Sequence, residues 1–404
     1  MTGAIRTAAG DAERRPIGVA VSLPYVPELE SLRGIAALLV LTFHYDAAVQ
    51  GPLQRHEGDW VSLPYAFIRA GDTGVSLFFV LSAFLLAMPF LAAADGGTPV
   101  AIRRYAQRRA LRILPLYFVV VAAATAATAT TLGDLVRGVP YLFFLNGLDP
   151  AVARMPPWSN VWWSLATEIQ FYLALPLLPL ALRSRRSRAI ALAGLAVYAA
   201  AFLLYERWLI GFRHPPHNVL LGLSLFGRAP LFLCGIVAAA FYLRHGSSLR
   251  RRLAAMAWLR GGGADLLLFA LLLGLALWMR WETFVGVGRL NAPPAHALRA
   301  AEGPLWSALV LWLLLAPLRL KPLLHNALLT RAGVLSYSIY LLHLPVLQYG
   351  QRALRAVGLT IPWGWSGRTA AVAAGLAAVC LVLSTATYRL IEAPFLRRKE
   401  RLRS

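Results

Sequence analysis

"TGVSLFFVLSAFLLAMPFLAA", residues 73–93, decides the fold because it runs without a single charged side chain. A helix needs about 20 predominantly apolar residues to cross the roughly 30 Å hydrocarbon core of a bilayer. Comparable segments recur along the whole chain. They lie near 34–50, 73–93, 113–132, 158–182, 189–206, 219–243, 264–281, 303–318, 333–350 and 367–391. The sequence therefore predicts an all-α, polytopic integral membrane protein of about ten transmembrane helices, with the lipid bilayer as its surroundings.

The overall composition is also that of a membrane protein. The chain has 404 residues, of which 58% are apolar and 14% charged, whereas about a quarter of the residues in a soluble protein are charged. The two cysteines, Cys234 and Cys380, lie in apolar runs and indicate neither a disulfide framework nor a zinc site. No metal cofactor is expected.

The net charge of +22 comes from short basic clusters between the apolar segments. The clusters occupy 103–112, 183–188, 244–252, 319–321 and 397–403. With the N-terminus inside, all five face the cytoplasm and the anionic lipid headgroups there. We therefore predict a multi-pass protein of the inner (cytoplasmic) membrane with both termini in the cytoplasm. No basic stripe with interleaved aromatic residues lies on a soluble module, so nucleic acid is not an expected partner.

A single membrane domain is expected over 28–395, because no repeat, coiled coil or soluble module interrupts the apolar segments. Residues 1–27 lack the continuous apolar core of a signal peptide and are predicted to be a cytoplasmic tail. Residues 396–404 are predicted to form a second, basic cytoplasmic tail.

Ionisable side chains inside the predicted spans are the candidate functional residues, because charge within a bilayer is costly. His44 lies in the first span, eleven residues after Arg33. At 100° and 1.5 Å per residue, the two side chains share one helix face about 16 Å apart. Arg33 is then near the cytoplasmic rim and His44 deep in the membrane. A structural histidine that hydrogen-bonds to a neighbouring helix is the open alternative.

Glu168, in the fourth predicted span, ends a polar stripe with i, i+4, i+7 and i+8 spacing on one helix face. The stripe consists of Asn160, Ser164, Thr167 and Glu168. A hydrated cavity explains such a stripe better than a lone ion pair. Arg228, near the predicted outer end of the sixth span, is an open partner for Glu168; it could equally bind a ligand or extend to the interface.

His343, in the ninth predicted span, shares one polar helix face with Ser336 and Tyr340, because the three follow i, i+4 and i+7 spacing. Pro345 follows closely, and its missing N–H frees a backbone carbonyl near the imidazole. A purely structural role for His343 stays open.

The basic cluster 103–112 continues into the start of the third span. It contains Arg104, Arg108, Arg109 and Arg112, with i, i+3 and i+4 neighbours among them. Guanidinium groups at this density suit a polyphosphate better than one lipid headgroup. Basic residues that simply flank a span account for part of the cluster, but not for its extension into the helix.

Six motifs resemble, in order, those of the membrane acyltransferase-3 family. They are "ELESLRGIAALLVLTFHY" (28–45), "GVSLFFVLSAFLL" (74–86), "RRALRILPLY" (108–117), "WSLATEIQFYLALPLL" (163–178), "LSYSIYLLHLPV" (335–346) and "YRLIEAPF" (388–395). The family includes O-antigen and exopolysaccharide O-acetyltransferases and macrolide O-acyltransferases. One departure is visible: the family's usual Ser-Gly-Phe is Ser82-Ala83-Phe84 here. Alanine keeps close helix packing, but a glycine-specific backbone conformation would be lost.

The resemblance implies an O-acyltransferase that moves an acyl group, usually acetyl, from cytoplasmic acyl-CoA to a hydroxyl of a sugar or glycosylated acceptor. Such an enzyme transfers groups other than amino-acyl groups, with acyl-CoA as its donor substrate. Carried over by position, the resemblance marks Arg33, His44, Arg109, Arg112, Glu168, Tyr340, His343 and Glu392 as site residues.

These residues suggest a mechanism for acyl transfer. A neutral imidazole can take the proton of the acceptor hydroxyl near neutral pH, so His44 is the predicted general base. Glu168 is predicted to orient it or to carry a second proton. Arg33, Arg109 and Arg112 are predicted to hold the CoA phosphates. An acyl-histidine intermediate, the acceptor, the acyl length, the side of acylation and the oligomeric state all stay open.

Two other functions fit a bundle of spans with buried ionisable residues. A proton-coupled secondary transporter would use them as a proton relay, but the sequence lacks the inverted repeats and paired broken helices of such folds. A non-catalytic polysaccharide-assembly membrane protein gives no reason for the arginine density of 103–112. Transfer of label from acetyl-CoA would separate an acyltransferase from both.

Overall fold

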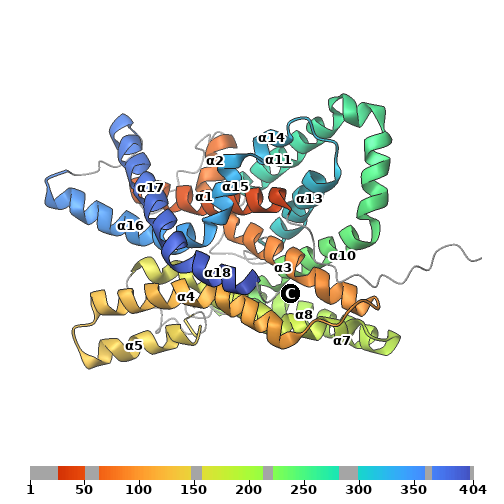
Figure 1. Cartoon of the computed structure of the whole chain (residues 1–404), viewed down its shortest axis with the longest axis horizontal. Helices are drawn as coiled ribbons and strands as arrows, with labels where there is room; N and C mark the ends of the chain where they lie inside the picture. Colours follow the sequence, from red (N-terminus) through yellow and green to blue (C-terminus); the bar gives the residue numbers. More distant parts are fainter. Residues whose placement is uncertain are drawn as a thin grey trace, which may run out of the picture.

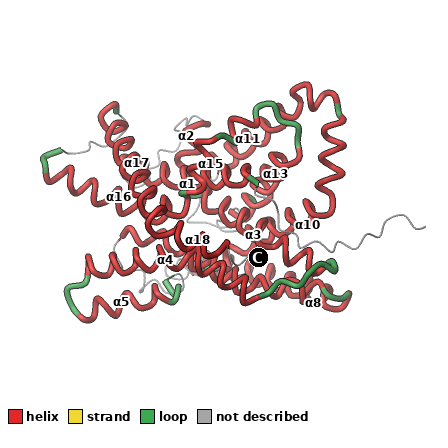
Figure 2. The backbone as a smooth tube through the Cα atoms, viewed as in Figure 1, coloured by secondary structure: helices red, strands yellow, loops and turns green. Residues whose placement is uncertain are grey.

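The computed structural model describes residues 26–50, 63–146, 157–212, 222–281, 299–359 and 366–400. Within these ranges helices are joined by short loops, and no strand is present (Figure 2). The helices shown in Figure 1 or used below are α1 (Pro27–Gln50), α2 (Leu63–Arg69), α3 (Thr73–Ala94), α4 (Ile102–Thr128), α5 (Leu132–Leu142), α6 (Trp163–Ala174), α7 (Leu178–Leu182), α8 (Arg185–Phe212), α10 (Leu225–Ala255), α11 (Ala264–Arg280), α13 (Glu302–Leu315), α14 (Lys321–Leu324), α15 (Ala327–Val334), α16 (Ser336–Ala356), α17 (Gly367–Thr387) and α18 (Ala393–Glu400).

Seven helices of the described ranges are long and apolar enough to cross a membrane, and an eighth is added if the bent pair Lys321–Val334 and Ser336–Ala356 is one span. The seven are Thr73–Ala94, Ile102–Thr128, Trp163–Leu182, Arg185–Trp208, Leu225–Ala255, Leu259–Arg280 and Gly367–Arg398. The other two predicted segments belong to α1 and to α13, which has only 14 residues. The all-α, multi-pass membrane fold is confirmed. Ten spans and the cytoplasmic location of both termini stay predictions.

α3 contacts α1, α10 and α13 and lies near the centre of the molecule (Figure 1). More than half of it is buried, which explains why it carries no charge. Ala83 is fully buried against α10, where a Cβ added at Gly235 would lie 2.7 Å from the Ala83 Cβ. The alanine of Ser82-Ala83-Phe84 therefore keeps the two helices close because α10 supplies a glycine opposite it. Ala83 lies within a regular helix, so no glycine conformation is needed there.

The crossing of α1 and α15 brings their backbones into direct contact. A Cβ added at Gly34 would lie 2.2 Å from the carbonyl oxygen of Leu329, and one added at Gly333 would lie 1.8 Å from that of Glu30. Neither distance can accommodate a methyl group, so both positions require glycine. Because Arg33 neighbours Gly34, this crossing also fixes where Arg33 lies relative to α15 and α16.

Gly333→Ala is expected to lower the free energy of unfolding by about 1–3 kcal/mol, since the new methyl group can be fitted only by separating the two backbones. Gly194→Ala on α8 is the matched control, because no atom lies within 4 Å of the added Cβ. That variant should be neutral or more stable by about 0.5–1 kcal/mol. Thermal unfolding in detergent measures both, and equal shifts for the two variants would contradict the close crossing.

Two irregularities bring the C-terminal third of the chain to α1 and α4. A bend of 66° separates α15 from α16, and the Tyr337 hydroxyl donates a hydrogen bond of 2.7 Å to the Ile113 carbonyl of α4. A π-helical turn, η7 (Tyr388–Glu392), then buries Glu392, which is 5% exposed. π-Turns within α-helices are frequent at functional sites. Of the residues that these irregularities position, Tyr337 lines the cavity described next, and Glu392 interacts with two arginines that line it.

Candidate active site

A cavity of about 700 Å³, including its open mouth, lies between α1, α3, α4, α6 and α16. Its walls combine an apolar surface with a smaller set of polar groups. The apolar residues are Val75, Phe78, Phe79, Leu81, Leu85, Leu86 and Leu165; the polar ones are Arg33, Ser82, Arg109, Arg112, Ser164, Glu168, Tyr172, Ser336, Tyr337 and Tyr340. Such a pocket, apolar with a few placed polar groups, is typical of a small-molecule site.

Three arginines from two helices line this cavity: Arg33 of α1, and Arg109 and Arg112 of α4. Arg33 and Arg112 lie within electrostatic range of each other although both are positive. The earlier residues of the same cluster, Arg103 and Arg104, are exposed. The whole cluster 103–112 lies within α4; its first two arginines face solvent, whereas Arg109 and Arg112, further along the helix, line the cavity.

Glu168 of α6 is the carboxylate that lines the cavity among the described residues. Its Oε1 accepts hydrogen bonds of 2.7 Å from the Ser82 hydroxyl and 2.5 Å from the Tyr172 hydroxyl. Arg33 also lies within electrostatic range of Glu168. Of the polar stripe predicted on this helix, Ser164 and Glu168 line the cavity.

Tyr340 and Ser164 line one part of the cavity and are joined to each other. The Ser164 Oγ and Tyr340 hydroxyl lie 2.6 Å apart, and the Tyr340 hydroxyl donates a bond of 2.6 Å to the Val161 carbonyl. The Tyr340 ring packs edge-on against Phe78, another lining residue. These contacts hold the Tyr340 ring between the cavity and the next turn of α16, where His343 lies.

His44 and His343 form a pair next to the cavity but do not line it. His343 Nε2 lies 3.3 Å from His44 Nδ1. A carbonyl only accepts hydrogen bonds. His44 Nδ1 lies 2.9 Å from the Val40 carbonyl and His343 Nδ1 lies 2.8 Å from the Tyr340 carbonyl, so in the neutral rings both protons are assigned to Nδ1.

With the protons assigned in this way, His44 is the hydrogen-bond donor of the pair and His343 is the acceptor. His44 Nδ1–H faces both the Val40 carbonyl and the lone pair of His343 Nε2. The remaining nitrogen of His44, Nε2, then carries a lone pair and can accept a proton. Sequence analysis placed the Arg33 and His44 side chains on one face of a helix. The structure places them on one helix, with Arg33 lining the cavity and His44 connected to it through His343 and the backbone of Tyr340.

Glu392 lies at the edge of the arginine cluster. Its carboxylate accepts a hydrogen bond from the Ser338 hydroxyl, which in turn accepts one of 2.9 Å from Thr387. Arg112 and Arg33 lie within electrostatic range of Glu392. The predicted site residue Glu392 is therefore close to the phosphate-binding candidates and distant in sequence from them.

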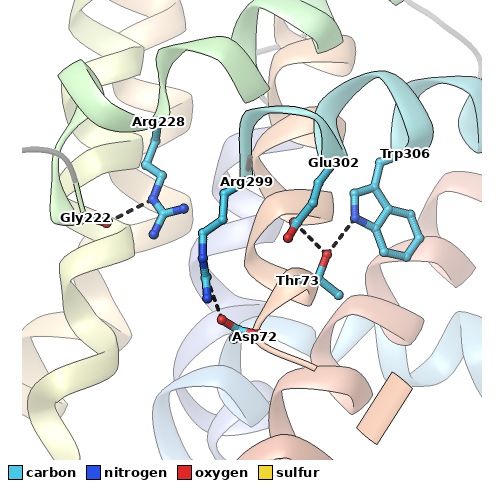
Figure 3. A network of polar contacts seen from close by, with 7 residues as sticks. All are labelled: Asp72, Thr73, Gly222, Arg228, Arg299, Glu302 and Trp306. Carbon is cyan, nitrogen blue, oxygen red and sulfur yellow. Dashed lines mark hydrogen bonds and ion pairs between the residues drawn. The ribbon is translucent and has the colours of Figure 1, made fainter. Parts of the chain in front are cut away.

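Arg228 lies in the first turn of α10 and makes a different set of polar contacts (Figure 3). Its Nε donates a bond of 2.9 Å to the Gly222 carbonyl, and its guanidinium lies 5.1 Å from the centre of the Trp163 ring. The sequence left open whether Arg228 pairs with Glu168, binds a ligand or extends to the interface. Its hydrogen bond and its stacking on Trp163 account for its 8% exposure within the protein.

A separate set of polar contacts in the same region attaches the start of α3 to the start of α13 (Figure 3). Asp72 and Arg299 form an ion pair of 2.6 Å. The Thr73 hydroxyl donates to the buried Glu302 carboxylate at 2.7 Å and accepts from the Trp306 indole at 2.9 Å. These contacts are at the opposite end of α3 from its connection to the arginine-bearing α4.

Sequence reasoning missed the two hydroxyl groups that bind Glu168. Tyr172 lies four residues after Glu168, which places it on the same helix face, so the spacing could have indicated it. Ser82 lies on α3, and no local pattern connects it with α6. Among the described residues, no group of three or more His, Cys, Asp or Glu is placed to hold a metal ion.

Comparison with known proteins identifies the family of this chain. The family model described as an acyltransferase domain, of acyltransferase type 3, matches residues 26–387. The chain belongs to the acyltransferase-3 family. The matched range contains every helix that contributes a residue to the cavity, and membership assigns the chain to the membrane acyltransferases. No solved structure matches the chain at a significant level.

Relatives in the acyltransferase-3 family differ in how much of this chain they match. Acyltransferase MdmB of Streptomyces mycarofaciens is 27% identical over 401 residues, which is 92% of each chain. Nodulation protein 10 of Rhizobium leguminosarum bv. viciae is 26% identical over 329 residues, 76% of this chain and 80% of the relative. Peptidoglycan O-acetyltransferase OatA of Listeria monocytogenes is 24% identical over 169 residues, 38% of this chain and only 24% of OatA.

Proposed function

We propose that this acyltransferase moves an acyl group, acetyl in the first instance, from cytoplasmic acyl-CoA to a hydroxyl of a sugar or glycosylated acceptor. The observation that carries the proposal is the cavity itself. Three arginines line it, and Tyr340 lies between it and an imidazole pair with one free nitrogen. An acyl-CoA needs a cationic site for its phosphates, an enclosed path for its arm and a base near its thioester.

The charge of the cavity supports a polyphosphate donor. Arg33, Arg109 and Arg112 contribute three positive charges, whereas Glu168 and Glu392 contribute two carboxylates. Guanidinium forks bind phosphate oxygens in pairs and do not lose their charge. The apolar wall next to them suits the arm and the acyl group of a thioester.

His44 is the proposed general base. The acceptor oxygen bonds to the thioester carbonyl carbon while His44 Nε2 takes the hydroxyl proton. The C–S bond then breaks, and the CoA thiolate leaves and takes that proton from the imidazolium. His343 stabilises the imidazolium by accepting a hydrogen bond from His44 Nδ1, with the two nitrogens 3.3 Å apart.

Glu168 is proposed as a positioning residue of the donor site. Its hydrogen bonds from Ser82 and Tyr172 fix the carboxylate, and its charge faces Arg33. Orienting a guanidinium in this way lowers the entropy lost when a phosphate binds. The glycan acceptor is proposed from the family: OatA is named a peptidoglycan O-acetyltransferase and MdmB an acyltransferase.

Purified protein in detergent or nanodiscs, supplied with acetyl-CoA labelled in the acetyl group, tests the function directly. Release of CoA thiol together with label in a glycan or in acetate is the expected result. A transporter or an assembly protein would release neither. Absence of turnover, together with absence of a thermal shift on adding CoA, would refute the proposal.

Arg112→Gln is expected to raise KM for acetyl-CoA by about 10- to 100-fold, the value of one charge-assisted hydrogen bond. KM for S-acetylpantetheine, which has no phosphates, should stay at the wild-type value. Arg103→Gln is the matched control, because Arg103 belongs to the same basic cluster but is exposed. An equal effect of Arg112→Gln on both donors would contradict phosphate binding.

A further inference from the structure

Ser336 is the first residue of α16 and an unusual member of the cavity wall. It is 1% exposed and lines the cavity. Its hydroxyl is buried without a hydrogen-bond partner among the described residues. The Nε of Arg109, in the same cavity, is buried in the same state. An unsatisfied buried donor destabilises a protein, and both residues line the same cavity, so a ligand that brings a polar atom to each donor would satisfy them.

The distance of Ser336 from the histidine pair, measured along the helix axis, identifies which part of an acyl thioester would reach it. Ser336 lies seven residues before His343, so the two are about 10 Å apart along α16. Arg33 lies about 16 Å from His44 along α1. The two histidines are in contact. Gly34 also lies against Gly333, so the chain runs in the same direction from Gly34 to His44 and from Gly333 to His343. Along this direction, Ser336 lies between the imidazole pair and the level of Arg33.

A pantetheine arm carries its polar groups at matching intervals. Five bonds separate the thioester carbonyl carbon from the first amide carbonyl carbon, four more lead to the second amide carbonyl carbon, and five more to the phosphorus. With ordinary C–C and C–N bond lengths, these groups lie about 6, 11 and 17 Å from the thioester in an extended arm. The second amide then reaches the level of Ser336 when the phosphate reaches Arg33.

We propose that the Ser336 hydroxyl donates a hydrogen bond to the second amide carbonyl of a bound pantetheine arm. The proposal rests on the proposed function and adds a substrate-binding residue to it. Ser336 thus fixes how far the arm enters, and with it the position of the thioester relative to His44. CoA and the prosthetic group of an acyl carrier protein share this arm, and turnover with acetyl-CoA or with an acetylated carrier protein distinguishes the two sources.

The test compares Ser336→Ala with wild type on three donors. Acetyl-CoA and S-acetylpantetheine carry both amides, whereas S-acetyl-N-acetylcysteamine carries only the first. Ser336→Ala should lower kcat/KM for the two longer donors by about 2- to 12-fold, the range of a neutral hydrogen bond, mostly through KM. It should leave kcat/KM for the shortest donor unchanged.

Ser307→Ala is the matched control, because Ser307 on α13 is also a buried hydroxyl without a partner but does not line the cavity. It should match wild type on all three donors. Wild-type kinetics of Ser336→Ala with acetyl-CoA, or an equal loss with every donor, would overturn the proposal. If wild-type protein neither turns over nor binds any donor, the proposed function fails and this inference fails with it.

Discussion

His44→Ala is expected to lower kcat for acetyl transfer by about 10²–10⁴-fold, the usual contribution of a general base. Removing the imidazole takes away the proposed base, while the arginines and Ser336 that are proposed to hold the donor are untouched. KM for acetyl-CoA should therefore change little. His343→Ala should cause a smaller loss, because it leaves the base in place and removes only the ring that accepts from His44 Nδ1.

The matched control for this experiment is His245→Ala. His245 lies on α10, is exposed, and contacts the Phe241 ring with the centroids 5.3 Å apart. This variant should keep wild-type kcat. Fluorescence size-exclusion chromatography and a thermal unfolding curve confirm that each variant is folded. A folded His44→Ala protein with wild-type transfer would remove His44 from the mechanism and leave its pair with His343 a structural contact.

The second large effect concerns stability. Arg69→Met is expected to lower the free energy of unfolding by about 3–5 kcal/mol, because it breaks a buried ion pair. Asp46 on α1 is 1% exposed and Arg69 on α2 is 9% exposed, and their charged groups are 2.6 Å apart. Tyr65 donates a further hydrogen bond of 3.1 Å to Asp46. The pair attaches α2 to the end of the helix that carries His44.

A double variant separates charge from packing in this experiment. Asp46→Leu combined with Arg69→Met should recover most of the lost stability, since apolar pairs can replace buried ion pairs at little cost. Arg244→Met is the exposed control: its pair with Asp95 is 3.5 Å long with side chains 59% and 57% exposed, so the change should stay within about 1 kcal/mol. A single and a double variant of equal stability would contradict a charge effect at Asp46.

Most helices were predictable because lipid exposure and burial impose the same apolar composition on a span. The run 73–93 has no charge for that reason, and α3 follows it closely. The break between α15 and α16 was not predictable, because 333–350 is apolar on both sides of it. Next to that break, Gly333 contacts the backbone of α1, and this contact joins segments about 300 residues apart.

The site shows the same division between local and distant information. Spacing along single helices indicated that Glu168 and Arg112 lie on polar helix faces. A charged residue within an apolar span stands out in the sequence itself, so no knowledge of neighbouring helices was needed. The pairing of His44 with His343 joins positions 299 residues apart, and no local pattern specifies it. Ser336 was recognised only as part of a polar face; its missing partner is a property of the folded cavity.

α1 holds Arg33 and His44 on one uninterrupted helix, and this limits which changes of length the chain can tolerate. One residue inserted between them would turn His44 by about 100° around the helix axis and move it by about 1.5 Å. The imidazole would then face away from His343 although every side chain of the site was still encoded. Insertions and deletions in 34–43 should therefore abolish activity and also lower stability, because they turn the Asp46 carboxylate away from Arg69 as well.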